Sequence, residues 1–212
     1  MDKLNHVIQQ NDTLTKKFEK QEKINQELKN EILDLKTKYL DMQKELISLN
    51  INKRDTEQTK LEKNIVISGI PKLGENVSEN KQIVNDIAKV LKVNMEAEEF
   101  KCAIIGHQQN KQLKVIFKKK ETKDLLMTAK KNFALNATQV GFTENQTLYL
   151  NHDLTKENQI IFKLAREMKK EKKIKYVWFA DNKLYARKSD NSKIWAINTE
   201  EDLKVFHANP KN

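Results

Sequence analysis

The stretch NIVISGIP, residues 64–71, separates two kinds of sequence in a chain of 212 residues. Its three consecutive β-branched residues stop at Gly69 and Pro71, which is typical of a buried strand that ends in a turn. Before it, residues 1–63 contain neither glycine nor proline, and after it come short apolar runs, turns and clustered lysines. The stretch therefore predicts the point at which a long helix gives way to a globular fold.

The upstream segment repeats apolar residues at alternating spacings of three and four, the heptad pattern of a left-handed coiled coil. From Leu28 to Leu49 every a and d position is apolar. Asn11, Gln21 and Asn25 interrupt the seam nearer the N-terminus, where buried polar residues lower stability but fix register and strand number. We predict homo-oligomerisation through the apolar seam residues, which are Leu4, Val7, Leu14, Phe18, Leu28, Ile32, Leu35, Tyr39, Met42, Leu46 and Leu49.

Residues 1–60 are thus predicted to form the coiled coil, and asparagine at a positions favours a homodimer. The alternative is one long helix that folds back on the globular part. Polar residues dilute the seam over residues 51–63. We expect the helix to persist there while its oligomeric contact loosens, as in a hinge.

The charge balance points to a polyanionic partner. The formal net charge is +10 at pH 7. Acids and bases alternate in the heptad segment, as on a solvated helix face, whereas lysines form runs downstream. One such run is typical of a solvated surface, but three runs in one small region favour binding of an anionic polymer.

Other classes of protein fit the sequence less well. Cys102 is the single cysteine, which excludes a disulfide framework and favours a reducing compartment. No apolar run approaches membrane-spanning length, and the N-terminus lacks a secretory signal pattern. We therefore expect an intracellular protein without a membrane partner, in the cytoplasm or the nucleus.

No catalytic constellation stands out. The four histidines are scattered, no second metal ligand lies at zinc spacing from Cys102, and the four glycines are isolated. His152 and Asp153 resemble the general base and its acidic partner in a nuclease active site. They are interpreted instead as part of the region that precedes a helix cap. The sequence predicts no enzyme activity, no metal and no cofactor.

Residues 61–152 are predicted to alternate in the order strand, helix, strand, strand, helix, strand. This doubled split β-α-β is the ferredoxin-like pattern, on which small RNA-binding domains of the RRM type are built. The predicted strands lie at residues 65–67, 103–106, 113–117 and 147–150. The apolar faces of the predicted helices comprise Ile83, Ile87, Val90 and Leu91, then Leu125, Leu126 and Ala129. Because many activities share this fold, function must come from the sheet surface.

That surface is predicted to lack the usual stacking residues. Val66 occupies the position where the first strand of an RRM normally carries an exposed aromatic. The outward positions of the third strand are predicted to be Gln112, Lys114 and Ile116. Stacking worth about 1–3 kcal/mol per base is therefore absent from these strands. We expect binding through phosphates, with little sequence specificity and a steep salt dependence.

Residues 153–212 are predicted to form a small basic α+β domain: a helix capped by Thr155, a three-stranded meander over residues 176–197 and a short helix capped by Thr199. Along the strands, Tyr176 and Trp178 share one face, and Tyr185 and Arg187 share another. Trp178 and Trp195 are interpreted as core residues. The whole chain is therefore an α+β protein with an N-terminal coiled-coil helix.

Two groups of cations are predicted to contact nucleic-acid phosphates. The first group is Lys114, Lys118, Lys119, Lys120, Lys130 and Lys131, and the second is Lys169, Lys170, Lys172, Lys173, Arg187 and Lys188. Each contact is exchangeable, so binding depends on many weak contacts multiplied by oligomerisation.

This arrangement resembles the first-open-reading-frame RNA-binding proteins of LINE retrotransposons and is more similar to the FP family, named for the baculovirus few-polyhedra protein and also found in insect retroelement-derived proteins. The similarity spans residues 60–207. It is carried by residues 64–71, 114–117, 124–131, 148–155, 176–178, 184–188 and 197–203.

The resemblance implies a self-associating protein that coats RNA or single-stranded nucleic acid, with chaperone behaviour. It also implies a homotrimer, as in the LINE relatives, so a homodimer and a homotrimer are both retained. The alternative is a viral or cellular scaffold protein that acts through its coiled coil in particle or complex assembly.

Overall fold

A computed structural model describes residues 2–74, 76–96, 99–107 and 110–206 of the chain. The chain divides into two compact units, Met1–Asn52 and Lys53–Asn212. The secondary structure is mixed, with one long helix, two antiparallel sheets and several short helices. The predicted α+β class is therefore confirmed.

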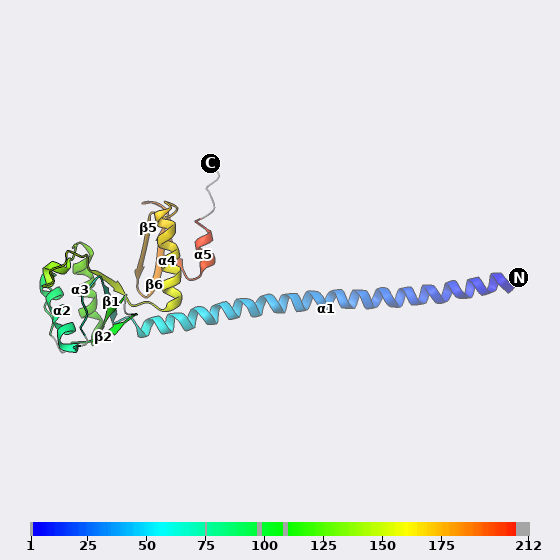
Figure 1. Cartoon of the computed structure of the whole chain (residues 1–212). Coiled ribbons are helices and arrows are strands. Elements are labelled where there is room, and N and C mark those ends of the chain that lie inside the picture. The colour runs from blue at the N-terminus through cyan, green and yellow to red at the C-terminus, as the bar shows by residue number, and fades with distance from the viewer. Residues whose placement is uncertain (1, 75, 97–98, 108–109, 207–212) are drawn as a thin grey trace. The chain divides into compact units, whose positions relative to one another are not determined.

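The long helix α1 spans Asp2–Lys60 without interruption (Figure 1). The absence of glycine and proline explains its continuity, since these residues weaken or break helix interiors. The seam residues predicted for oligomerisation are between 49% and 74% exposed in the single chain. A helix gains most of its stability from packing an apolar face, so this helix is left with its apolar side chains in water unless a partner covers them.

The larger sheet has the strand order β2-β3-β1-β4, and every adjacent pair is antiparallel. This order, with the element sequence β-α-β-β-α-β, is the ferredoxin-like topology predicted from the sequence. Its elements are β1 (Asn64–Ser68), α2 (Val77–Val90), β2 (Phe100–Ile105), β3 (Gln112–Phe117), α3 (Lys120–Lys131), a 3-10 turn η1 (Ala137–Val140) and β4 (Tyr149–His152).

Alternating residues of the sheet form the core with α2 and α3. Ile65 and Ile67 are fully buried and belong to one cluster with Val84, Ile87 and Leu126. Each such side chain contributes about 1.5–3 kcal/mol on burial. The predicted helix faces are slightly rotated. Ile83 and Val90 are only partly buried, whereas Val84, Ala88 and Leu91 are buried, and Leu125 lies on the surface.

Gly69 ends β1 for a steric reason. Its φ is +83°, and a Cβ atom at this position would lie 2.2 Å from the carbonyl oxygen of Thr147. Only glycine fits both the backbone conformation and the close approach. The turn predicted after the first strand therefore depends on this residue.

The C-terminal part has its own core and a three-stranded sheet in the order β5-β6-β7. Thr155 accepts a hydrogen bond from the backbone N–H of Asn158 and Thr199 accepts one from that of Asp202, so both predicted helix caps are confirmed. Asp181 and Asn182 have positive φ values and form the two-residue hairpin between the first two strands. The elements are α4 (Lys156–Lys170), β5 (Tyr176–Ala180), β6 (Lys183–Arg187), β7 (Ile194–Ile197) and α5 (Glu200–Lys204).

The last turns of α1 are anchored to the globular unit. Gln58 is 1% exposed, donates to the carbonyl oxygen of Asp153 at 2.8 Å, and accepts hydrogen bonds from the backbone N–H of Thr155 and the side chain of Asn158. Arg54 donates to the backbone oxygen of Asn198. The helix continues through this region, as predicted. The expected hinge does not include Arg54 and Gln58, because their polar side chains make hydrogen bonds with the globular unit.

Candidate nucleic-acid interface

A groove of about 1100 Å³ lies beside the sheet face that α2 and α3 leave uncovered. One side is formed by residues of the larger sheet and another by one side of α4, and Phe179 of β5 also lines the groove. The sheet supplies Val66, Ser68, Ile105, Gln112, Tyr149 and Asn151, and α4 supplies Gln159, Phe162, Lys163, Arg166, Glu167, Lys169 and Lys170. The groove is thus a polar and aromatic channel with a strongly basic wall.

Strand register explains the sheet wall. Val66 pairs with Lys114 on one side and Asn151 on the other, so their side chains share the face opposite the Ile65 and Ile67 core. As predicted, the outward positions of β1 and β3 carry no aromatic. Tyr149, on the same face of β4, is 56% exposed and lines the groove. The face therefore keeps one stacking residue that the sequence analysis did not identify.

The basic wall follows from the amphipathic pattern of α4. Ile161, Ala165 and Met168 are buried against the small sheet, which turns the intervening residues toward the groove. The guanidinium of Arg166 lies 4.4 Å from the centre of the Phe162 ring. Such a cation over a ring keeps the charged group beside an apolar surface, an arrangement suited to a ligand with both phosphates and bases.

A buried polar network closes one end of this face. The Lys114 ammonium lies 2.7 Å from the Asp153 carboxylate, which also accepts a hydrogen bond from Asn64 at 3.0 Å. The backbone oxygen of Asp153 is bonded to Gln58. The network therefore ties α1, β1, β3 and the start of α4 together. It also neutralises Lys114, so the phosphate contact predicted for this lysine is not supported by its geometry.

His152 lies outside this network. Its ring centre is 5.2 Å from that of Phe179, and its neighbour across the strands is the core residue Ile65. Burial, the largest cause, and the charge of Lys123 together lower the pKa of His152 to about 4, while the charge of Asp124 opposes the change. The ring is therefore neutral at pH 7, and the Asp153 carboxylate is bonded to Lys114 and Asn64.

We expect His152 to make the globular unit less stable as the pH is lowered from about 7 to about 4. In the unfolded chain the ring takes up a proton below its ordinary pKa of 6.5, whereas in the folded chain it does so only near pH 4. Stability is thus fully present above pH 6.5 and falls below it by up to about 1.4 kcal/mol per pH unit, levelling off below pH 4. Urea unfolding of the wild-type chain and of His152→Gln between pH 7 and 4 tests this. Equal pH slopes would contradict it.

The structure places the predicted phosphate-binding cations at several sites. Lys169 and Lys170 line the groove. Lys120 pairs with Glu62 at 3.3 Å, which raises the pKa of that lysine, and Lys173 pairs with Glu171 at 2.7 Å. Lys130 donates to the backbone oxygen of Phe133. The surface positions Lys118, Lys119, Lys131, Lys172 and Lys188 do not line the groove, and Arg187 lies on the small sheet.

Lys163, Arg166 and Phe162 are groove residues that the sequence analysis missed. The signal was available in the helical period, because residues 162, 163, 166 and 170 fall on one side of a helix whose other side is buried. Runs of consecutive lysines mark only the end of α4, whereas the groove also uses cations spaced three to four residues apart along the helix.

Within the described residues, no three histidine, cysteine or carboxylate side chains are close enough to hold a metal ion. Burial raises the pKa of Cys102 to about 11, so its thiol is protonated. No helix in the described ranges combines the length and the apolar character needed to cross a membrane.

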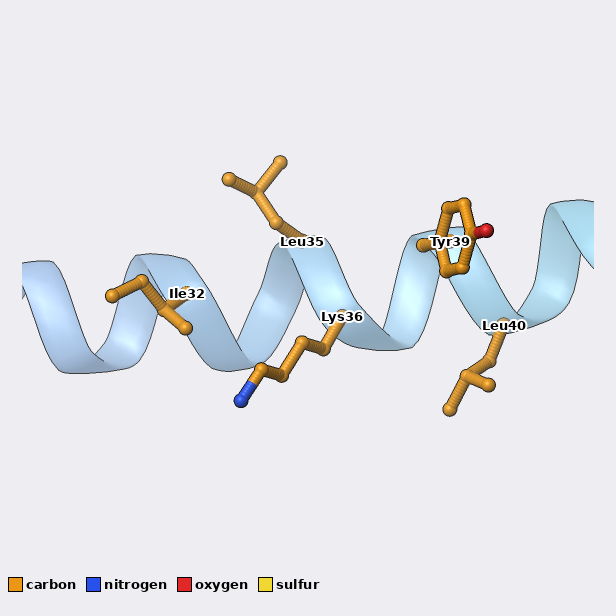
Figure 2. A pocket seen from close by; sticks show the side chains of 5 residues that line it. All are labelled: Ile32, Leu35, Lys36, Tyr39 and Leu40. Carbon is orange, nitrogen blue, oxygen red and sulfur yellow. The ribbon is translucent and has the colours of Figure 1, made fainter.

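The predicted oligomerisation seam forms a hollow on one side of α1. Ile32, Leu35, Lys36 and Tyr39 stand at positions i, i+3, i+4 and i+7 and, with Leu40, surround it (Figure 2). In a coiled coil each knob inserts into a hole formed by four residues of the facing helix. This set has that spacing. Leu33, Leu40 and Ile47, at b positions, are also exposed and widen the apolar face beyond the predicted a and d residues.

Comparison with known families gives a match in the C-terminal part. Residues 155–207 match the model of the family described as baculovirus FP protein domain 2. The match begins at the cap of α4 and includes all three strands of the small sheet and α5. The predicted resemblance to the FP family is thus confirmed over these residues, whereas the resemblance to LINE proteins stays a prediction. A search of curated proteins gave no match.

Proposed function

We propose that this protein is an oligomeric, nucleic-acid-binding protein that holds RNA or single-stranded DNA in the groove. The observation that carries the proposal is the basic wall of α4, Lys163, Arg166, Lys169 and Lys170, which faces a sheet surface bearing Tyr149. In this proposal the protein acts by binding and not by catalysis. Its partners are nucleic acid and further copies of itself.

The geometry of the groove favours a single strand. Lys163 and Lys170 are separated by about 10 Å along the helix, a length that several phosphates of an extended strand can follow. Tyr149 and Phe162 offer ring faces for bases, which are accessible only when the strand is unpaired. Since phosphate contacts dominate, binding is expected to discriminate little between sequences.

Oligomerisation strengthens this binding. Linking several modest sites raises avidity by about 10²–10⁴ when one strand can reach all of them. The exposed seam of α1 supports such linkage, whether the oligomer is a dimer or a trimer. A chain that binds strands at several points can also rearrange them, which is the basis for the chaperone behaviour that we include in the proposal.

The double substitution Lys163→Ala with Arg166→Ala tests the groove. Losing two phosphate contacts is expected to lower the slope of log affinity against log salt by about 1.4 and the affinity near 0.15 M salt by about tenfold. Binding is measured by fluorescence anisotropy with a single-stranded oligonucleotide of about 10 nucleotides, the length scale of one small binding module. Lys118→Ala with Lys119→Ala is the matched control, because it removes the same charge from surface positions outside the groove.

Equal losses in the two double variants would show that charge acts without a defined groove. No binding by the wild-type chain, together with an intact oligomer, would favour the alternative function, a scaffold that assembles through its coiled coil. The exposed apolar seam of α1 is the observation that supports this second function.

A further inference from the structure

The outer face of the small sheet gathers aromatic and basic side chains. Tyr176 pairs with Arg187 and Trp178 pairs with Tyr185 across β5 and β6, so all four side chains share one face. The sequence pattern alone predicts separate faces for the pair Tyr176 and Trp178 and the pair Tyr185 and Arg187, and a core position for Trp178; strand register shows that both predictions are wrong. We call the four residues Tyr176, Trp178, Tyr185 and Arg187 the aromatic face.

The helices pack on the other side of this sheet. Leu184, Ala186 and Ile197 form the core with α4 and α5, and Trp195 packs edge-on against Phe206, 6.4 Å between ring centres. Trp195 is thus a core residue, as predicted. On the aromatic face, the neighbouring Ile194 is 51% exposed. The four residues of the aromatic face are half-buried, and none of them belongs to the core cluster on the other side of the sheet. Packing in that core therefore does not account for them, and part of each ring is open to a ligand.

The rings are arranged as a stacking surface. Trp178 and Tyr185 are stacked with ring centres 5.7 Å apart and an angle of 22° between the planes. The guanidinium of Arg187 lies 4.8 Å from the centre of the Tyr176 ring. The buried Nε of Arg187 has no hydrogen-bond partner among the described residues. Planar rings and a guanidinium group therefore lie side by side.

The charges around the aromatic face select an anion. Lys183 lies on the same face of β6 as Tyr185 and Arg187, and Lys175 precedes β5, with its ammonium 5.3 Å from the centre of the Tyr176 ring. The nearest acid, Asp190, is already bonded to Lys175 and Tyr176. A cationic peptide would be repelled here. A ligand that combines negative charge with planar apolar groups fits both features, and single-stranded nucleic acid has this chemistry.

We propose that the aromatic face is a second binding surface for single-stranded nucleic acid, on which unpaired bases stack against Trp178 and Tyr185 while Arg187 contacts phosphate. The inference rests on the proposed function. None of the four residues lines the groove. The small sheet contributes Phe179 of β5 to the groove, and the side chain of Phe179 lies on the opposite face of that strand from Trp178. The groove and the aromatic face are therefore separate surfaces, so the nucleotides held in the groove are not those stacked on the aromatic face.

Fluorescence of Trp178 in the full-length protein tests the inference. Titration with a thymine homo-oligonucleotide is expected to quench the tryptophan signal, because stacked bases quench the indole. Quenching should be lost in Trp178→Phe, which removes the reporter and keeps a ring. An abasic phosphodiester of the same length is the matched ligand, since it brings the charge without bases. Quenching by the abasic polymer to the same extent would overturn the inference.

The groove and the aromatic face can be separated by a parallel anisotropy measurement. Trp178→Leu with Tyr185→Leu is expected to weaken binding by about tenfold or more, and Trp178→Phe by much less. Lys163→Ala with Arg166→Ala should leave the quenching at saturation unchanged. Binding by anisotropy without quenching of Trp178 overturns this inference alone. Absence of binding in both measurements overturns the proposed function as well.

Discussion

Ile32→Glu combined with Tyr39→Glu is expected to convert the proposed oligomer into a monomer. Both residues occupy a positions in the most apolar part of the seam and border the hollow on α1. Two carboxylates per helix would have to be buried next to those of the partner, and burying unpaired charge costs several kcal/mol per group. Sedimentation equilibrium reports the mass. Avidity for a long single strand should fall by about 10²–10⁴, whereas affinity for a short oligonucleotide should change little.

Asn30→Glu combined with Thr37→Glu is the matched control for the seam. It adds the same two charges at the same seven-residue spacing, but at f positions, which face away from a and d. The control is expected to stay oligomeric. A wild-type chain that sediments as a monomer would contradict the coiled coil, and an oligomer that survives Ile32→Glu with Tyr39→Glu would place the interface elsewhere.

Local patterns made much of the fold predictable. The heptads and the lack of glycine and proline predicted α1, and Gly69 and Pro71 marked the end of β1. Thr155 was identified as a cap because its hydroxyl lies where the first turn of α4 needs an acceptor. These features depend on neighbours within a few residues, so the sequence alone carries them.

Features that depend on strand register were harder to predict. The position of Tyr149 on the open face follows from the pairing of β4 with β1. The position of Trp178 outside the core follows from the pairing of β5 with β6. The ion pair between Lys114 and Asp153 connects residues 39 positions apart, a contact that no local pattern encodes. The pairing of distant segments therefore decides which of the predicted cations lie in the groove and which lie elsewhere.

The largest stability effect is expected from Asp153→Ala. The carboxylate is 9% exposed and holds both the Lys114 ammonium and the Asn64 amide, so its removal leaves a buried charge and a buried donor without a partner. Breaking a buried pair costs about 3–5 kcal/mol. We expect about 3 kcal/mol, because the Lys114 side chain is 23% exposed and can reach water.

The double variant Lys114→Met with Asp153→Ala decides whether this loss arises from the unpaired charge. Removing both partners takes away the buried ammonium, so the double variant is expected to be more stable than Asp153→Ala alone, with a coupling energy of about 1–3 kcal/mol. Urea unfolding is measured for the wild type, for the single variants Asp153→Ala and Lys114→Met, and for the double variant. All four proteins are measured at one fixed concentration, because any oligomerisation makes the apparent stability depend on concentration. Additive effects of the two substitutions would show that the ion pair contributes nothing and that Asp153 acts only through Asn64.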